Sequence, residues 1–396
     1  MQIADRIQQI SASQSLLMAS RCRELQNQGV DVINMSLGEP DQDTPLFIKN
    51  AAQQAIADNW SHYGPVPGIV SLRQAIAAHQ NAFSGNSIDW TAEDVIVSVG
   101  AKAAIYNAIQ TIINEGDEVI IPTPSWVSYG EMVKLAGGKV VAIPTTAENR
   151  YCLTAEQLQR AITPRTRLLI LCSPNNPTGT IYSDSCMDEL ADVLRAYPEV
   201  NILSDEIYNG LTYGTSARSW AYYADLAERL IIVNGVSKTY AMTGYRIGWS
   251  ICKNKAFTAA CTRLQSQQFT CATMIAQKAA ETALAGEQQR VERLRIEFAE
   301  RRDLICRMAR EIKGWTFVEP QGAFYLFPDI TNLLGKTFAS RELRTTDDVA
   351  EYLLEEAHVA VVSGSAFGDP SCIRLSFAIN NEAIVEAMKR IKNALR

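Results

Sequence analysis

The sequence predicts an α/β protein whose central sheet is mostly parallel and flanked by helices, joined to a smaller α+β part. From Val95 onward, short runs rich in β-branched residues alternate with helical stretches, and the runs are apolar enough to be strands covered on both faces. After Lys313, short apolar runs alternate with two helical stretches at residues 346–356 and 382–395, which is typical of an α+β arrangement. The length of 396 residues allows two to three domains.

The N-terminal part is expected to be mainly helical. Residues 13–29 mix apolar and polar residues at helical spacing, and the β-branched run Asp31–Met35 follows. Thr44 is expected to be the N-cap, and Pro45 the first residue, of a helix over PLFIKNAAQQAIADN. The Gly- and Pro-rich segment SHYGPVPG interrupts regular structure before a second helix over Ser71–Phe83.

The central part alternates strands and helices, and the C-terminal part is more irregular. The expected strands of the parallel sheet are VIVSV, EVIIP, KVVAIP, LLILC, VNILS, LIIV and YRIGWSIC, with helices AKAAIYNAIQTII and WVSYGEMVKLA after the first two. Residues 255–312 are expected to form long helices with one solvated, charged face. The short strands expected after them are WTFV, AFYLF, VAVV and IRLSFA.

Composition and charge exclude several classes of function. The net charge of −6 does not support a nucleic-acid-binding surface. The nine cysteines form no C-x-x-C pair, which indicates reduced thiols, and none lies near the three histidines at zinc-ligand spacing, so no metal site is expected. The N-terminus lacks the apolar core of a signal peptide, so we expect a cytoplasmic protein.

Two segments place polar groups at the ends of predicted strands. The turn SPNNPTGT directly follows LLILC, at the edge of the sheet where ligands bind in open α/β folds, although a purely structural turn is an equal alternative. In LSDEIYNG, Asp205 and Glu206 end another apolar strand, and Tyr208 follows. A carboxylate at such a place is costly to bury without a cationic partner, which favours a functional role.

A third segment, NGVSKTYAMTGYRIGW, places a lysine after the strand LIIV. Lys238 stands beside the hydroxyl of Ser237, and Arg246 follows within folding reach. A lone lysine in a loop is usually solvated, but this combination suits an amine nucleophile next to a phosphate group.

These three segments, in this order and at these intervals, resemble the pyridoxal-phosphate-dependent aminotransferases of fold type I. The resemblance is to the class I group of bacterial aspartate aminotransferase type, and it covers nearly the whole chain through the further blocks SLGEPDQDTP, SHYGPVPGI, VGAKAAIYNA, PTPSWVSY, QGAFYLF and IRLSFA. It implies a large domain that binds pyridoxal 5′-phosphate over residues 46–285. It also implies a small domain assembled from residues 1–45 and 286–396.

The resemblance implies how the cofactor is held. Lys238 would join the cofactor aldehyde and then carry protons, and Asp205 would pair with the ring nitrogen. Trp126 would stack on the ring, while Asn176 and Tyr208 would bind its phenolic oxygen. The phosphate would be bound by Gly100, Ala101, Lys102, Ser237 and Arg246, with Tyr63 of a partner subunit, which implies a homodimer with shared active sites.

It also implies how an amino acid substrate is held. Arg374 would bind the α-carboxylate with two parallel hydrogen bonds, a surface ion pair being the alternative. The remaining substrate contacts would come from Gly38, Trp126, Asn176 and, at the distal carboxylate, Lys102, Ser13 and Ser15. Serine at position 15 departs from the more frequent threonine, and Lys102 could instead balance the phosphate. The peptide bonds before Pro177 and Pro124 are candidates for the cis form.

The expected function is therefore a ping-pong transaminase that converts L-aspartate and 2-oxoglutarate to oxaloacetate and L-glutamate. The alternatives on the same fold are an aminotransferase for aromatic or other neutral amino acids or prephenate, and a β-lyase. A cofactor-binding regulator is disfavoured, because the residues before Asp31 are too few for a DNA-binding domain. A nicotinamide-dependent dehydrogenase is disfavoured because G-x-G-x-x-G is missing after the early strands.

Overall fold

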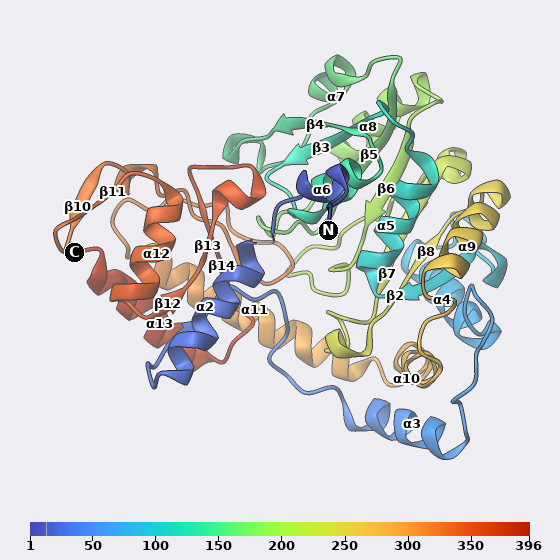
Figure 1. Ribbon diagram of the computed structural model, residues 1–396, viewed down its shortest axis with the longest axis horizontal. Helices are drawn as coiled ribbons and strands as arrows, with labels where there is room; N and C mark the ends of the chain where they lie inside the picture. The colour runs from blue at the N-terminus through green and yellow to red at the C-terminus, as the bar shows by residue number, and fades with distance from the viewer. Residues whose placement is uncertain (13) are drawn as a thin grey trace.

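The computed structural model describes residues 1–12 and 14–396, without the side chain of Ser15. A mixed sheet with strand order β2-β8-β7-β6-β5-β3-β4 forms its centre (Figure 1). The four neighbouring pairs from β7 to β4 are parallel, which confirms the mostly parallel α/β sheet. The strands are β2 (Val95–Val99), β3 (Glu118–Thr123), β4 (Lys139–Pro144), β5 (Thr166–Cys172), β6 (Asn201–Asp205), β7 (Leu230–Gly235) and β8 (Ile247–Ile251).

The expectation that YRIGWSIC is a parallel strand is wrong. Strand β8 runs antiparallel to both of its neighbours, β2 and β7. The chain between Gly235 and Ile247 contains no crossover helix, only the short 3-10 turn η5 (Thr243–Tyr245). A parallel return needs a longer crossover, so the chain turns back beside β7 in the opposite direction.

Helices cover both faces of the sheet, as the apolar strands predict. In β5, Leu168 and Ile170 belong to one hydrophobic cluster, and Leu169 and Leu171 belong to another. Because successive side chains of a strand point to opposite faces, the two clusters lie on opposite sides of the sheet. The first contains residues of α5 (Ala101–Ile112) and α6 (Ser128–Leu135), and the second contains residues of α3 (Leu46–Ala57), α4 (Val70–Phe83), α7 (Ala155–Ala161), α8 (Asp184–Ala196) and α10 (Met274–Ala285).

The segment from α2 to β1 packs with the C-terminal part of the chain beside this layered part, while α1 contacts α6 (Figure 1). Strand β1 (Ile33–Asn34) pairs in parallel with β12 (Val359–Ala360), and a small antiparallel sheet has the order β13-β14-β9. The proposed domain limits at residues 45/46 and 285/286 coincide with the start of α3 and the end of α10, and the division itself stays a prediction. The remaining elements are α1 (Asp5–Gln8), α2 (Gln14–Asn27), α9 (Lys255–Gln268), α11 (Gln289–Ala309), β9 (Tyr325–Leu326), β10 (Lys336–Phe338), β11 (Arg341–Leu343), α12 (Thr346–Glu356), β13 (Val362–Ser363), β14 (Ile373–Ser376) and α13 (Asn381–Ala394).

Some local expectations differ from the structure at element ends. Helix α3 begins at Leu46 with Pro45 as its N-cap, and the Thr44 hydroxyl donates to the Ala241 carbonyl (2.6 Å) instead of capping the helix. The run WTFV contributes only the isolated bridge Thr316–Asp329 and no strand. None of the helices in the described ranges has the length and apolar character needed to cross a bilayer.

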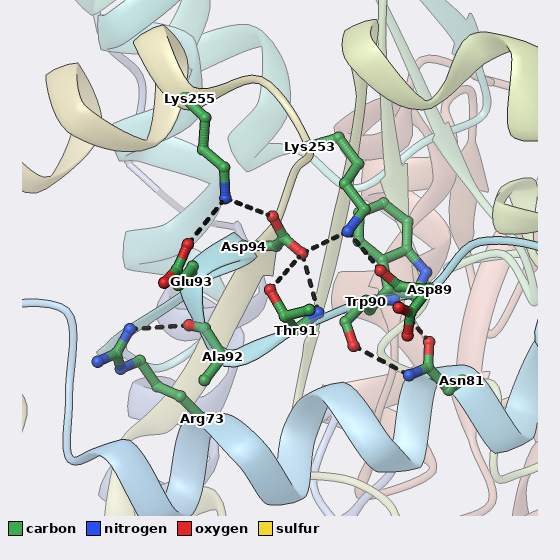
Figure 2. Close-up of polar contacts among 10 residues, drawn as sticks. All are labelled: Arg73, Asn81, Asp89, Trp90, Thr91, Ala92, Glu93, Asp94, Lys253 and Lys255. Atoms are coloured by element: carbon green, nitrogen blue, oxygen red, sulfur yellow. Dashed lines mark hydrogen bonds and ion pairs between the residues drawn. The ribbon is translucent and has the colours of Figure 1, made fainter.

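The buried carboxylate of Asp94 holds together the segments that meet at the start of β2 (Figure 2). Asp94 is 1% exposed and accepts hydrogen bonds from Lys253 Nζ (2.7 Å), Lys255 Nζ (3.0 Å) and the backbone and hydroxyl of Thr91 (2.9 and 3.0 Å). Burial raises the pKa of the Asp94 carboxyl, but the hydrogen bonds from Lys253 and Thr91 outweigh it, and the net pKa is lowered. The cluster joins the short helix η1 (Ala92–Asp94) to the segment after β8.

We expect Asp94→Asn to lower the free energy of unfolding by about 2 kcal/mol at pH 7, because the two lysines lose their buried partner. Urea denaturation measures the loss. A carboxyl with a lowered folded pKa stabilises the protein above its usual value of 3.8, and this contribution is lost as the pH falls through the folded pKa. The difference in the free energy of unfolding between the wild type and Asp94→Asn should therefore become smaller at acidic pH. Glu93→Gln removes a neighbouring exposed carboxylate and should change stability little; equal losses in both variants would contradict the prediction.

Candidate active site

A cavity of about 380 Å³ opens at the carboxyl ends of the parallel strands, next to the start of α5. This is the edge of the sheet at which the sequence predicts the site. Eleven of the predicted residues line it: Gly38, Ala101, Lys102, Trp126, Asn176, Asp205, Tyr208, Ser237, Lys238, Arg246 and Arg374.

Four other predicted residues lie elsewhere. Gly100 is the N-cap of α5, directly before the lining residue Ala101. Tyr63 is not part of the cavity lining; it lies on the loop between α3 and α4 with its side chain exposed to solvent. Ser13 and the side chain of Ser15 lie outside the described residues.

Lys238 follows β7 and points its amine into the cavity. Its Nζ donates a hydrogen bond to the Gly38 carbonyl oxygen at 2.5 Å, which joins the N-terminal segment to the loop that follows β7. Burial lowers the pKa of Lys238 to about 8, against the opposing charge of the Glu39 carboxylate. About a tenth of such an amine is uncharged at pH 7, which is the form that acts as nucleophile and base.

Asp205 is the last residue of β6, and its carboxylate lies on the cavity wall. Its Oδ2 accepts from the Tyr129 hydroxyl at 2.6 Å, and its Oδ1 accepts from the Ile207 backbone N–H at 3.2 Å. Burial raises the pKa of Asp205 to about 6, and these hydrogen bonds oppose the rise. The side chain therefore remains largely ionised at neutral pH, ready for a cationic partner.

Glu206, which the sequence pairs with Asp205, lies away from this cavity. Its Oε1 accepts hydrogen bonds from the hydroxyls of Ser204 and Ser219 (3.0 and 2.8 Å) and from the Trp220 backbone N–H (3.3 Å). Neighbouring residues in extended backbone point to opposite sides, so only one of the two carboxylates reaches the cavity. Burial raises the pKa of Glu206 to about 7.

Arg374, on β14 of the small sheet, brings a buried guanidinium to the cavity lining. It is 3% exposed, which rules out the surface ion pair that the sequence left open. Its Nη1 donates to Asn176 Oδ1 (3.0 Å) and its Nη2 donates to the Ser36 carbonyl (2.6 Å). The guanidinium lies over the Tyr325 ring at 4.6 Å, and the Tyr325 hydroxyl is 2.8 Å from that of Tyr208.

The start of α5 forms a cradle for an anion. Gly100 has φ +81°, and a Cβ added there would lie 2.6 Å from Nη2 of Arg246. Gly248, on β8, lies so close to Ala101 that a Cβ would be 2.2 Å from its backbone nitrogen. Because neither glycine has a side chain, the first turn of α5, Arg246 and the sheet can approach one another closely. This approach directs backbone N–H groups and a guanidinium at one point.

The family is decided by comparison with known proteins. A model of the family described as aminotransferase class I and II matches residues 30–391. The chain belongs to the class I and II aminotransferases. The resemblance drawn from the sequence motifs is thereby confirmed, and the chain is an aminotransferase.

The relatives of this aminotransferase match it over nearly its whole length. The aspartate aminotransferase of Bacillus sp. (strain YM-2) is 42% identical over 98% of the chain and 98% of the relative. A probable aspartate/prephenate aminotransferase of Rickettsia felis is 41% identical over 99% of the chain and 96% of the relative.

Solved structures agree with the fold. The aspartate aminotransferase of Rhizobium meliloti has a TM-score of 0.96 and 38% identity, covering 100% of this chain and 99% of that one. The Thermus thermophilus aspartate aminotransferase with maleate has a TM-score of 0.93 and 37% identity, covering 100% of both chains.

Lys102 occupies the first turn of α5 in the aminotransferase. Its Nζ donates to Ser128 Oγ (3.2 Å) and lies 4.8 Å from the centre of the Trp126 ring. Burial and the nearby Arg246 charge lower the pKa of Lys102. The ammonium group is thus held beside the indole that lines the cavity, within reach of a second anionic group.

Sequence reasoning missed three groups that shape the cavity: Tyr129, Tyr325 and the Ser36 carbonyl. Tyr129 lies in the block PTPSWVSY, three residues after Trp126, and that spacing could have indicated a shared face at the start of α6. Tyr325 lies in QGAFYLF, but nothing in that run distinguishes it from a core aromatic. The carbonyl of Ser36 carries no signal in the sequence.

Proposed function

We propose that this aminotransferase uses pyridoxal 5′-phosphate and transfers the amino group of L-aspartate to 2-oxoglutarate in a ping-pong reaction, yielding oxaloacetate and L-glutamate. The observation that carries the proposal is the meeting of Lys238, Asp205 and Arg374 in one cavity. A nucleophilic amine, a buried carboxylate and a guanidinium are the groups that a carbonyl cofactor and an amino acid require. The names of the relatives support aspartate as the donor.

The residues present fit pyridoxal phosphate. The cradle at Gly100 and Arg246 suits its phosphate, with Ser237 beside it, and the Asp205 carboxylate suits its ring nitrogen. Trp126 and Tyr208 also line the cavity, where an aromatic ring could stack and a phenolic oxygen could be bound. When bound, the cofactor supplies a carbonyl carbon that takes up the amino group and a ring that accepts electrons.

Lys238 has the properties of the proton carrier in this reaction. Its pKa near 8 lets the amine take a proton from the substrate Cα and return it later at neutral pH. The Gly38 carbonyl holds Nζ in place from the side of the N-terminal segment. The partly buried position of the side chain limits the access of water to the amine.

Arg374 is proposed to bind the substrate α-carboxylate, with Gly38 beside it. Asn176 and Ser36 orient its planar guanidinium, which can then present two parallel N–H groups to a carboxylate. Lys102 is proposed to bind the distal carboxylate, together with the hydroxyls of Ser13 and Ser15.

The proposal includes a homodimer located in the cytoplasm. Tyr63 is 91% exposed, and it would reach the cofactor phosphate of a second subunit. Exposed apolar side chains accompany it on α3 and at the start of α4, where a partner could cover them: Leu46, Ile56 and Val70.

Substrate choice is tested by comparing amino donors in single turnovers. We expect Lys102→Ala to lower kcat/KM for aspartate about 10- to 100-fold, the effect of losing one charge-assisted contact. The value for phenylalanine should change less than threefold, because phenylalanine has no distal carboxylate. Lys139→Ala, an exposed lysine on β4, is the control.

The outcomes separate the alternatives. Equal losses for both donors would mean that Lys102 acts on the phosphate and not on the substrate. Faster turnover of wild-type protein with phenylalanine, or with prephenate as acceptor, would assign the aromatic or prephenate branch. Release of ammonia and a 2-oxo acid without an acceptor would assign a β-lyase.

A further inference from the structure

A tyrosine on α6 contacts two groups that face the cofactor cavity. The hydroxyl of Tyr129 donates to Asp205 Oδ2 at 2.6 Å. Its ring meets that of Trp126 edge to face, with 5.2 Å between the centroids and 87° between the planes. Tyr129 is 2% exposed, so neither contact competes with bulk water. One side chain thereby joins the end of β6 to the start of α6.

The hydroxyl matters because Asp205 is buried. Burial raises the pKa of Asp205, and the Tyr129 hydrogen bond is the largest effect that opposes this rise. The second donor, the Ile207 backbone N–H, lies at the longer distance of 3.2 Å. Without the hydroxyl, the buried Asp205 carboxylate would keep only the weak Ile207 donor. An ionised carboxylate with so little hydrogen bonding is costly to bury, and protonation of Asp205 would relieve that cost.

Tyr129 is suited to act only as a donor. Burial raises its pKa well above the usual value, and the Asp205 charge raises it further. The phenol therefore stays protonated over the working pH range and cannot release its proton to the carboxylate. Its hydrogen bond is short and charge-assisted, the kind that contributes most.

We propose that Tyr129 is a positioning residue for transamination, whose hydroxyl keeps Asp205 ionised and aimed into the cavity while its ring holds Trp126 against the cofactor. The inference rests on the proposed function, since it assumes that Asp205 pairs with the ring nitrogen and that Trp126 stacks on the ring. Tyr129 also lines the cavity, but in this assignment it acts through its two neighbours, Asp205 and Trp126.

Tyr129→Phe tests the hydroxyl alone, because phenylalanine keeps the ring and its contact with Trp126. We expect the dissociation constant of pyridoxal phosphate to rise about tenfold. The pH at which the visible absorption of the bound cofactor changes should fall by about half a unit, because the Asp205 charge helps to hold a proton on the Lys238 nitrogen. The kcat for aspartate should fall more than its KM rises, since Arg374 is untouched.

Tyr151→Phe is the matched control. Tyr151 is also a buried tyrosine, but its hydroxyl lies 3.7 Å from the Cys372 sulfur and it does not line the cavity. We expect this control to leave cofactor affinity and the spectral transition unchanged. A general loss of packing would affect both variants, whereas the proposed role affects only Tyr129→Phe.

A double-mutant cycle with Asp205→Asn asks whether Tyr129 acts through the carboxylate. We expect Tyr129→Phe to weaken cofactor binding less than twofold once the carboxylate is gone. Additive effects, or a single variant with a dissociation constant within twofold of the wild type and an unmoved spectral transition, would overturn the inference. A wild-type protein that binds no pyridoxal phosphate would instead overturn the proposed function and the inference with it.

Discussion

Replacing Lys238 by alanine will reduce transamination by about 10⁴-fold or more, because the amine is proposed to act both as the nucleophile for the cofactor and as the proton carrier. The Lys238 amine donates to the Gly38 carbonyl, whereas Lys102, the other lysine among the described residues that line the cavity, donates to Ser128 beside Trp126 and is not placed to replace it. A coupled assay of oxaloacetate formation measures the loss. Loss of the pH-dependent visible absorption of the bound cofactor should accompany it.

Lys238→Arg is the matched control for charge. It keeps a cation at this place, but a guanidinium does not lose its proton near neutral pH, so we expect the same inactivity. Recovery of activity by arginine would mean that only the charge of Lys238 matters. Unchanged turnover in Lys238→Ala would contradict the proposed function altogether.

The pKa of Lys238 also predicts how the cofactor-free protein takes up pyridoxal phosphate. Only the uncharged amine attacks a carbonyl, and the pKa is lowered to about 8 by burial. The rate of cofactor uptake should therefore rise with pH about tenfold per unit and level off above pH 8. Stopped-flow absorbance measures this rate. A rate that does not change between pH 6 and 8 would show that another group limits uptake.

Much of the fold could be predicted because its strands are buried on both faces. The apolar runs of β3, β5, β6 and β7 leave little doubt about strand type, and helices follow where periodicity changes. The direction of β8 could not be predicted from its own residues, because the connection before it determines the direction. The N-cap prediction at Thr44 failed for the same reason, a contact distant in sequence. Its hydroxyl donates to the Ala241 carbonyl, nearly two hundred residues away, instead of capping its own helix.

The site residues likewise divide into those that the sequence predicts and those that only the tertiary structure reveals. Lys238 and Asp205 stand in segments whose local pattern already suggests chemistry, whereas Arg374 was predicted only through the resemblance to a family; the structure brings all three to one cavity. Tyr129 was missed because its partner Asp205 lies 76 positions away in sequence, and only the tertiary fold brings the two together. Tyr63 shows a further limit, since its proposed target belongs to a second subunit.

Arg374→Lys will lower kcat/KM about 10²- to 10³-fold for every amino acid substrate. Lysine keeps the charge but offers a single ammonium in place of two parallel N–H groups. It also leaves Asn176 Oδ1 and the Ser36 carbonyl without their present donor in a buried site. Steady-state kinetics with aspartate and phenylalanine measure the effect, which should appear mainly in KM.

Because every amino acid carries an α-carboxylate, the loss in Arg374→Lys should be the same for both donors, whereas the loss in Lys102→Ala should be confined to aspartate. Together the two variants assign the two ends of the substrate to β14 and to α5. Arg218→Lys is the control for exchanging a paired arginine, since Arg218 pairs with Asp184 and Asp188 away from the cavity lining and should leave both substrates unaffected. A loss in Arg374→Lys that differs more than tenfold between the donors would place Arg374 at the distal group, and the proposed orientation of the substrate would have to be reversed.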